Sequence, residues 1–97
     1  MQVQPENTQA YHLFISGKVQ GVYYRASTAK KAQALGLQGW VRNLEDGRVE
    51  VHAQGPINEL DQLLTWCEKG PMLAKVRDIE CKLAQVDENM AQFEVMR

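Results

Sequence analysis

The chain has 97 residues with a hydrophobic fraction of 44% and a net charge of -1. This length predicts one domain with one core and one site, which excludes a catalytic domain joined to a separate regulatory domain. Eleven basic residues balance twelve acidic ones, so the basic excess with which proteins bind nucleic-acid phosphates is missing and no nucleic-acid partner is predicted.

The N-terminal segment, residues 1–9, is predicted to be a flexible leader, followed by a single domain over residues 10–97. The leader is polar, contains Pro5 and lacks the apolar core of a signal peptide. No apolar run approaches the roughly 18 residues that a membrane span needs. We therefore expect a cytoplasmic protein with no membrane partner.

A strand and a helix are predicted first. Residues 11–16 alternate between apolar and polar side chains, which is typical of a strand, and Gly17 is expected to end it. Residues 23–35 are rich in helix-forming residues and are followed by Gly36, a natural helix stop. The expected buried stripe of this helix consists of residues spaced three apart: Ala26, Ala29, Ala32 and Leu35.

A hairpin follows, because Glu45-Asp46-Gly47 separates two strand-like runs at residues 39–44 and 48–54. In the second run apolar and polar residues alternate, which predicts a half-buried strand. A second helix is predicted over residues 57–68, with strands at 75–83 and at 93–95. The apolar face of this second helix consists of Ile57, Leu60, Leu63, Leu64 and Cys67.

The resulting order is βαββαβ with a possible extra edge strand. We predict an α+β fold, a ferredoxin-like sandwich in which two helices cover one face of an antiparallel sheet. Right-handed crossovers place the first strand in the middle, beside the strands at 48–54 and 75–83. The other face of the sheet is expected to be open. This fold hosts many chemistries, so the function has to be argued from particular residues.

The connection between the first strand and the first helix reads Gly17-Lys18-Val19-Gln20-Gly21-Val22-Tyr23-Tyr24-Arg25. A chain that turns from a strand into a helix presents unpaired N–H groups and the positive end of the helix dipole, which together attract anions. Gly17 and Gly21 permit a positive φ, and Arg25 can bind two anion oxygens at once. These residues alone leave two alternatives open, an oxyanion site and a tight turn beside a solvated arginine. A nucleotide loop is excluded because G-x-x-x-x-G-K-[ST] is missing.

This stretch resembles the signature of the acylphosphatase family, and so does Leu35-Gly36-Leu37-Gln38-Gly39-Trp40-Val41-Arg42-Asn43. Gln54-Gly55 and Gly70-Pro71, on either side of the second predicted helix, match as well. The resemblance covers about residues 10–97 and implies the same βαββαβ order that the periodicity predicts.

The resemblance also implies roles for single residues. The family's phosphate-binding arginine falls on Arg25 and its water-orienting asparagine on Asn43. Lys18 stands where the family often has arginine, and Leu44 where it often has threonine. The family's phosphate-binding loop falls on Gly17, Lys18, Val19, Gln20, Gly21, Val22 and Tyr23.

The implied activity is the metal-independent hydrolysis of acyl phosphates to a carboxylate and inorganic phosphate. The partner is thus a small acyl phosphate, and inorganic phosphate is expected as product and inhibitor. No cofactor and no metal are implied, and we expect a monomer.

Two other functions are compatible with parts of the sequence pattern. An RNA-binding module shares the βαββαβ topology but needs stacking aromatic residues on the open face, where mainly Phe14 is expected. A non-catalytic anion-binding domain would keep the loop without turnover; the presence of both Arg25 and Asn43 argues against it.

The remaining candidate residues favour structural roles. His12 and His52 lack further ligands at metal spacing. Cys67 and Cys81 are interpreted as small hydrophobic residues in a reduced compartment, with a bridge between them left open. The aromatic residues Trp40, Trp66, Tyr23 and Tyr24 are expected to pack rather than to form a ligand cage.

Overall fold

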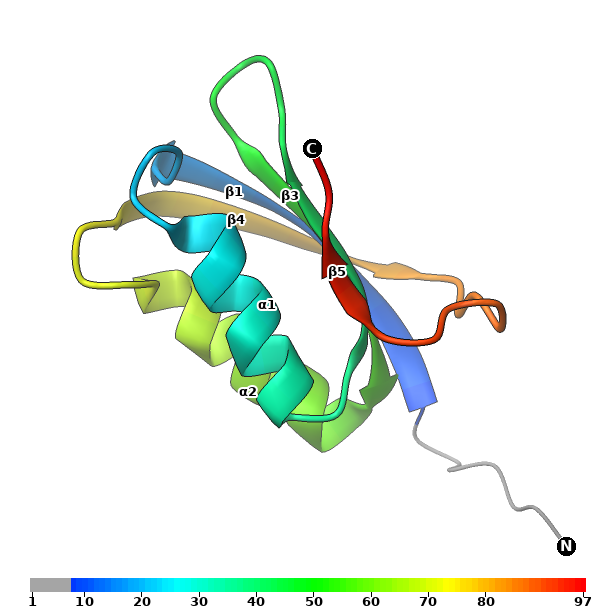
Figure 1. The fold of residues 1–97 in the computed structure, drawn as a ribbon. Helices are drawn as coiled ribbons and strands as arrows, with labels where there is room; N and C mark the ends of the chain where they lie inside the picture. The colour runs from blue at the N-terminus through cyan, green and yellow to red at the C-terminus, as the bar shows by residue number, and fades with distance from the viewer. Residues whose placement is uncertain (1–7) are drawn as a thin grey trace, which may run out of the picture.

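Five strands and two helices make up the fold in the computed structural model, which describes residues 8–97. Both helices lie on the same face of one sheet (Figure 1). The predicted α+β, ferredoxin-like fold is confirmed. The elements are β1 (Thr8–Lys18), α1 (Tyr24–Ala34), β2 (Gln38–Asn43), β3 (Val49–Pro56), α2 (Ile57–Lys69), β4 (Lys75–Ala84) and β5 (Phe93–Val95).

The strand order is β4-β1-β3-β2-β5, so β1 lies between β3 and β4, as the crossover rule predicts. The prediction of a wholly antiparallel sheet is wrong at one edge. There β5 runs parallel to β2, with Phe93 opposite Gly39 and Val95 opposite Val41. Residues 85–92 carry the chain from β4 at one edge to β5 at the other (Figure 1), and the returning strand enters in the direction of β2.

The strand β1 is longer than predicted at both ends. Residues 1–7 of the predicted leader lie outside the described residues, but Thr8 and Gln9 already pair with β3. At the other end Gly17 does not stop the strand. It sits at a register shift against β4, with a φ of 127°, and a Cβ there would collide with the Lys75 carbonyl. The connection to α1 is therefore only residues 19–23.

The helix α1 is turned relative to its predicted stripe. Ala29 and Ala32 are buried as expected, but Ala26 is exposed and Thr28 is fully buried instead. A constant spacing of three residues falls behind the helical repeat of 3.6, so no single face can hold all four predicted positions. In α2 the predicted apolar face is correct, since Leu60, Leu63 and Cys67 are buried. Neither helix is long and apolar enough to cross a membrane.

The strand β3 was predicted to be half-buried, and this is wrong. Glu50, His52 and Gln54, on the face opposite the helices, are 6%, 8% and 2% exposed. Side chains of neighbouring strands cover them, because β3 is a central strand. The Glu50 carboxylate lies 2.6 Å from His12 Nε2 and accepts a hydrogen bond of 2.6 Å from Arg42 Nε. Burial raises the pKa of Glu50, but the bonds from Arg42 and His12 outweigh it, so the pKa is lowered overall.

Aromatic residues on this open face are more numerous than the sequence indicated. Besides Phe14, the indole of Trp40 lies there, stacked on His52 with ring centroids 6.0 Å apart. The ring of His12 stacks on Phe14 at 4.8 Å. These rings are thus packed against one another rather than spread as separate platforms.

Gly39 in β2 is required by close packing within the sheet. Its φ is 144°, and a Cβ would collide with the His52 carbonyl of β3. Any other residue at this position would push the two strands apart.

Candidate active site

The loop of residues 19–23 is anchored to the core by two valines. Val19 and Val22 are 1% and 4% exposed, while Gly21 between them is exposed and has a φ of 76°. Space is open where a Cβ of Gly21 would be, since no heavy atom lies within 4 Å of that position. The backbone at Gly21 is therefore accessible to a ligand.

A pocket of about 360 Å³ opens beside this loop. It brings together Arg25 from α1 and Asn43 from the end of β2, the two residues singled out from the sequence. Its lining consists of Val19, Gly21, Tyr23, Tyr24, Arg25, Ala26, Asn43 and Val95.

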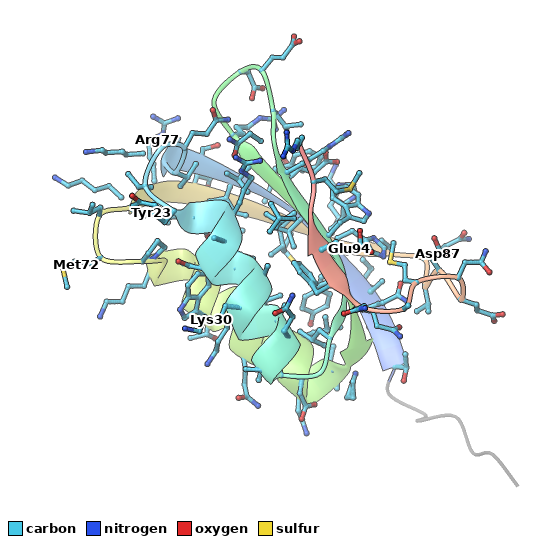
Figure 2. All side chains as sticks on the ribbon, in the orientation of Figure 1. Tyr23, Lys30, Met72, Arg77, Asp87 and Glu94 are labelled. Carbon is cyan, nitrogen blue, oxygen red and sulfur yellow. The ribbon has the colours of Figure 1, made fainter. Side chains whose placement is uncertain are left out.

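The N-terminus of α1 meets this pocket with no compensating negative charge. Tyr23 occupies the N-cap position in the left-handed conformation, with φ 65° and ψ 20°, and it makes no side-chain capping bond. The first turn holds no acidic residue, so its N–H groups and the positive end of the dipole are left for another partner. Arg25 adds a full positive charge in the same turn. Figure 2 shows Tyr23 where the chain enters α1.

Arg25 is held by the C-terminal segment. Its Nη1 donates a hydrogen bond of 3.0 Å to the carbonyl of Met96. The Met96 amide in turn donates to the Val41 carbonyl at 2.8 Å, which continues the pairing of β5 beside β2. The contribution of Val95 and Met96 to the surroundings of Arg25 was not predicted from the sequence. No local sequence pattern indicates which strand the last strand of the chain will pair with.

Asn43 is the last residue of β2, and its side chain carries an unusual feature. Its Oδ1 atom is buried and has no hydrogen-bond partner among residues 8–97. A buried amide oxygen without a partner is unfavourable unless water or a ligand satisfies it. Asn43 also lines the pocket, so its amide group is close to any polar ligand that binds there.

The predicted phosphate loop divides into two groups in the structure. Val19, Gly21 and Tyr23 line the pocket, as does Arg25. Gly17 and Lys18 belong to β1, and Lys18 is exposed opposite Lys75 of β4. Val22 lies in the core, and the side chain of Gln20 is bonded to the β2–β3 hairpin.

Tyr24 and Ala26 also line the pocket, although the sequence argument had not singled them out. Both are chain neighbours of Arg25, and that position was the only signal for them. The expectation that Tyr24 packs is correct: it is 1% exposed, and its hydroxyl donates a 2.7 Å bond to the Cys67 carbonyl.

The two cysteines are free thiols in different surroundings. Cys67 is buried, and burial raises its pKa to about 12, so the thiol is inert as a nucleophile at neutral pH. Cys81 is exposed on β4, so only Cys67 packs as a small hydrophobic residue of the core. His12 and His52 share the open face with ring centroids 6.4 Å apart. Within residues 8–97, no three His, Cys, Asp or Glu side chains are grouped to hold a metal ion.

Comparison with known proteins decides the family. Residues 11–95 match the model of the family described as Acylphosphatase. The chain belongs to the acylphosphatase family. An acylphosphatase of Methylococcus capsulatus is 50% identical over 86 residues, which cover 89% of this chain and 94% of that protein. The resemblance drawn from the two sequence motifs is thereby confirmed, together with the enzyme class.

Solved structures of the family have the same fold. The structure of an acylphosphatase from Coxiella burnetii matches with a TM-score of 0.89 and 38% identity, covering 94% of this chain and 95% of that one. An acylphosphatase from Bacillus subtilis matches with a TM-score of 0.86 and 34% identity, covering 91% and 98%.

Proposed function

We propose that this chain hydrolyses acyl phosphates to a carboxylate and inorganic phosphate without a metal ion. The loop of residues 17–23 and Arg25 hold the phosphate, and Asn43 orients the attacking water. One observation carries the proposal. The Arg25 guanidinium, the uncompensated N-terminus of α1 and Asn43, whose Oδ1 has no partner among residues 8–97, all border one pocket.

The phosphate is the natural ligand for the positive side of this pocket. Its oxygens accept bonds from the free N–H groups at the start of α1 and from the backbone around Gly21. Arg25 now donates to a neutral carbonyl, that of Met96. A phosphate is a stronger partner for Arg25 than a carbonyl, because it is negatively charged and can accept two parallel hydrogen bonds from the guanidinium.

The water is placed by Asn43. An amide side chain both accepts and donates, so it can fix the orientation of one water, and the buried Oδ1 supplies a vacant acceptor. The water attacks phosphorus in line with the departing carboxylate: a new P–O bond forms as the bond to the acyl oxygen breaks. Asparagine is a poor base, so the proton of the water passes to a phosphate oxygen. The carboxylate leaves without a strong general acid.

The acyl group receives little direct recognition in this proposal. The groups that act hold only the phosphate and the water, so we expect acyl groups of different size to be accepted. All of these groups belong to one chain, so the proposed site needs no second subunit. That the protein is a monomer stays a prediction from the sequence. A cytoplasmic location stays a prediction from the sequence.

The test is hydrolysis of synthetic acetyl phosphate and benzoyl phosphate by the wild type, Arg25→Ala and Asn43→Ala, with a chelator present throughout. We expect turnover by the wild type, competitive inhibition by inorganic phosphate, and near-complete loss of activity in both variants. Two matched controls remove the same kinds of group from exposed helix positions, Lys30→Ala on α1 and Asn58→Ala on α2, and both should stay active. An inactive wild type that still binds phosphate would favour the non-catalytic anion-binding domain. Full activity in both site variants would refute the residue assignment.

A further inference from the structure

Gln20 sits in the middle of the phosphate loop, but its side chain does not line the pocket. The half-buried amide points to the β2–β3 hairpin instead. Its Nε2 donates a bond of 2.8 Å to the Leu44 carbonyl and a second, of 2.9 Å, to the Arg48 carbonyl. Both N–H donors of the amide are used in these two bonds.

The two carbonyls flank the position of Asn43. Leu44 follows Asn43 directly, and Arg48 directly precedes Val49, the residue that pairs with Asn43 across the hairpin. The Leu44 amide also donates to the Arg48 carbonyl at 2.8 Å, so Gln20 binds the hairpin where its two strands separate. One side chain thus joins the loop that borders the phosphate space to the strand end that carries Asn43.

The topology leaves room for such a link. The loop follows β1 and Asn43 ends β2, but these strands are not neighbours, because β3 lies between them in the order β4-β1-β3-β2-β5. No ladder of backbone hydrogen bonds joins β1 to β2 directly: the two strands are connected only through β3. In-line attack tolerates little error in that distance, since a displacement of about 1 Å can cost roughly 100-fold in rate.

We propose that Gln20 is a positioning residue for the reaction: it sets the distance between the phosphate in the loop and the water on Asn43. This inference rests on the proposed function and goes beyond it, because the side chain of Gln20 acts through the hairpin and not on the phosphate or the water. The side-chain chemistry is specific. Two donors at the end of a three-carbon reach are needed, whereas an ionised glutamate would set a negative charge against two carbonyls, and methionine has the length but no donor.

The main test is Gln20→Met, compared with Gln33→Met as a matched control. Gln33, near the far end of α1, also donates from its amide to a backbone carbonyl, that of Phe93 at 3.0 Å. In Gln20→Met the Arg48 and Leu44 carbonyls each keep a backbone donor, so the hairpin is expected to fold. We expect kcat to fall about 10- to 100-fold, while the inhibition constant of inorganic phosphate changes less than about twofold. The control should keep its kcat within about twofold. A raised inhibition constant with an unchanged kcat would overturn the proposal, because Gln20 would then act in phosphate binding.

A double-mutant cycle separates positioning of the water from general support of the loop. If Gln20 acts through Asn43, adding Gln20→Met to Asn43→Ala should reduce the residual activity by less than about twofold. Independent, multiplying effects would overturn the proposal. The proposed function fails separately, through an inactive wild type or a fully active Asn43→Ala. A wild-type kcat in Gln20→Met with an inactive Asn43→Ala would overturn only the role of Gln20.

Gln20→Glu offers a second measurement that does not depend on methionine being tolerated. Its protonated carboxyl regains one donor, whereas its ionised form has none. The kcat of this variant relative to wild type should therefore rise as the pH falls through the pKa of the new carboxyl. A ratio that stays flat with pH would contradict the proposal.

Discussion

The two strand-to-helix connections of this fold have the same topological role, but they differ in loop length and in the charge at the start of the helix. Between β1 and α1 the chain makes a loop, residues 19–23, and enters the helix through Tyr23 in the left-handed conformation. Between β3 and α2 no loop intervenes, since Pro56 ends the strand in an extended conformation and Ile57 begins the helix. Neither helix has a side-chain cap.

The difference in charge is the instructive one. The first turn of α2 contains Glu59, which compensates the positive end of its own dipole, whereas the first turn of α1 contains no acid and carries Arg25. A helix start that is left positive in this way has given up some stability in the free protein. That cost is recovered when an anion binds, so the contrast between the two helix starts indicates which one serves binding.

The strongest test of this contrast is Arg25→Ala. We expect kcat/KM to fall by about 1,000-fold or more. Losing a single preorganised hydrogen-bond donor typically costs about 100- to 1,000-fold in rate, and Arg25 is in addition charged and bidentate. The free energy of unfolding should stay the same or rise by about 0.3–1 kcal/mol, because a cation is removed from a helix N-terminus. Steady-state kinetics and thermal denaturation measure the two quantities. A large loss of stability in this variant would mean that Arg25 is a structural residue.

Asn43→Ala should have the next largest effect, a loss of about 100- to 1,000-fold in kcat. The inhibition constant of inorganic phosphate should be unchanged, because Asn43 places the water and not the phosphate. Its Oδ1 has no partner in the part of the chain described, so little stability should be lost. Product-inhibition kinetics measure the inhibition constant of phosphate. Much weaker inhibition by phosphate would place Asn43 in phosphate binding.

Ala26→Glu makes α1 resemble α2 by placing an acid in its first turn. Ala26 is exposed and lines the pocket, so the fold should hold while phosphate binds about fivefold more weakly, equivalent to about 1 kcal/mol of repulsion at a partly solvated site. Stability should increase by about 0.3–1 kcal/mol. Ala34→Glu, which puts the same charge at the exposed C-terminal end of α1, is the control and should leave phosphate affinity unchanged. Equal effects from the two positions would show that net charge alone is responsible.

Glu59→Gln is the smallest change and the converse one. It removes the compensating charge from α2 and should lower the free energy of unfolding by about 0.3–1 kcal/mol at low salt, with the difference shrinking as salt is added. The kinetic constants should not change, because Glu59 does not line the pocket. Urea denaturation at two ionic strengths is sufficient. An altered phosphate affinity would contradict the assignment of binding to α1 alone.

The sequence predicted the elements better than it predicted their surroundings. Periodicity correctly placed the hairpin and the face of α2. The signature around Gly21 predicted a site at the connection of β1 and α1, and the structure has a pocket there that Gly21, Arg25 and Asn43 line. The sequence could not predict that β5 runs parallel to β2, because strand pairing between distant segments leaves no local pattern. For the same reason the Met96 carbonyl on Arg25 was missed.

The alternation of residues in β3 was misleading for a different physical reason. Polar residues at every second position normally indicate a solvent-exposed face. Here Arg42 pairs with the Glu50 carboxylate and His12 contacts it from the other flanking strand, so a charged residue is buried. Likewise, Gln20 was assigned to the phosphate loop from its place in the motif, and nothing in the motif indicated that its side-chain amide would contact the hairpin. A position within a motif does not reveal the direction of its side chain.

The close packing at Gly17 and Gly39 has a consequence for how genomes are read. A Cβ at either position would strike the backbone of the neighbouring strand, so both glycines are demanded by the sheet, whether or not the protein turns over substrate. A descendant of this chain that had lost its chemistry would still be forced to keep them, and would still match much of the motif. Those glycines are therefore evidence of common ancestry. If the proposed function is correct, the evidence of a working enzyme is instead an arginine and an asparagine at the positions of Arg25 and Asn43.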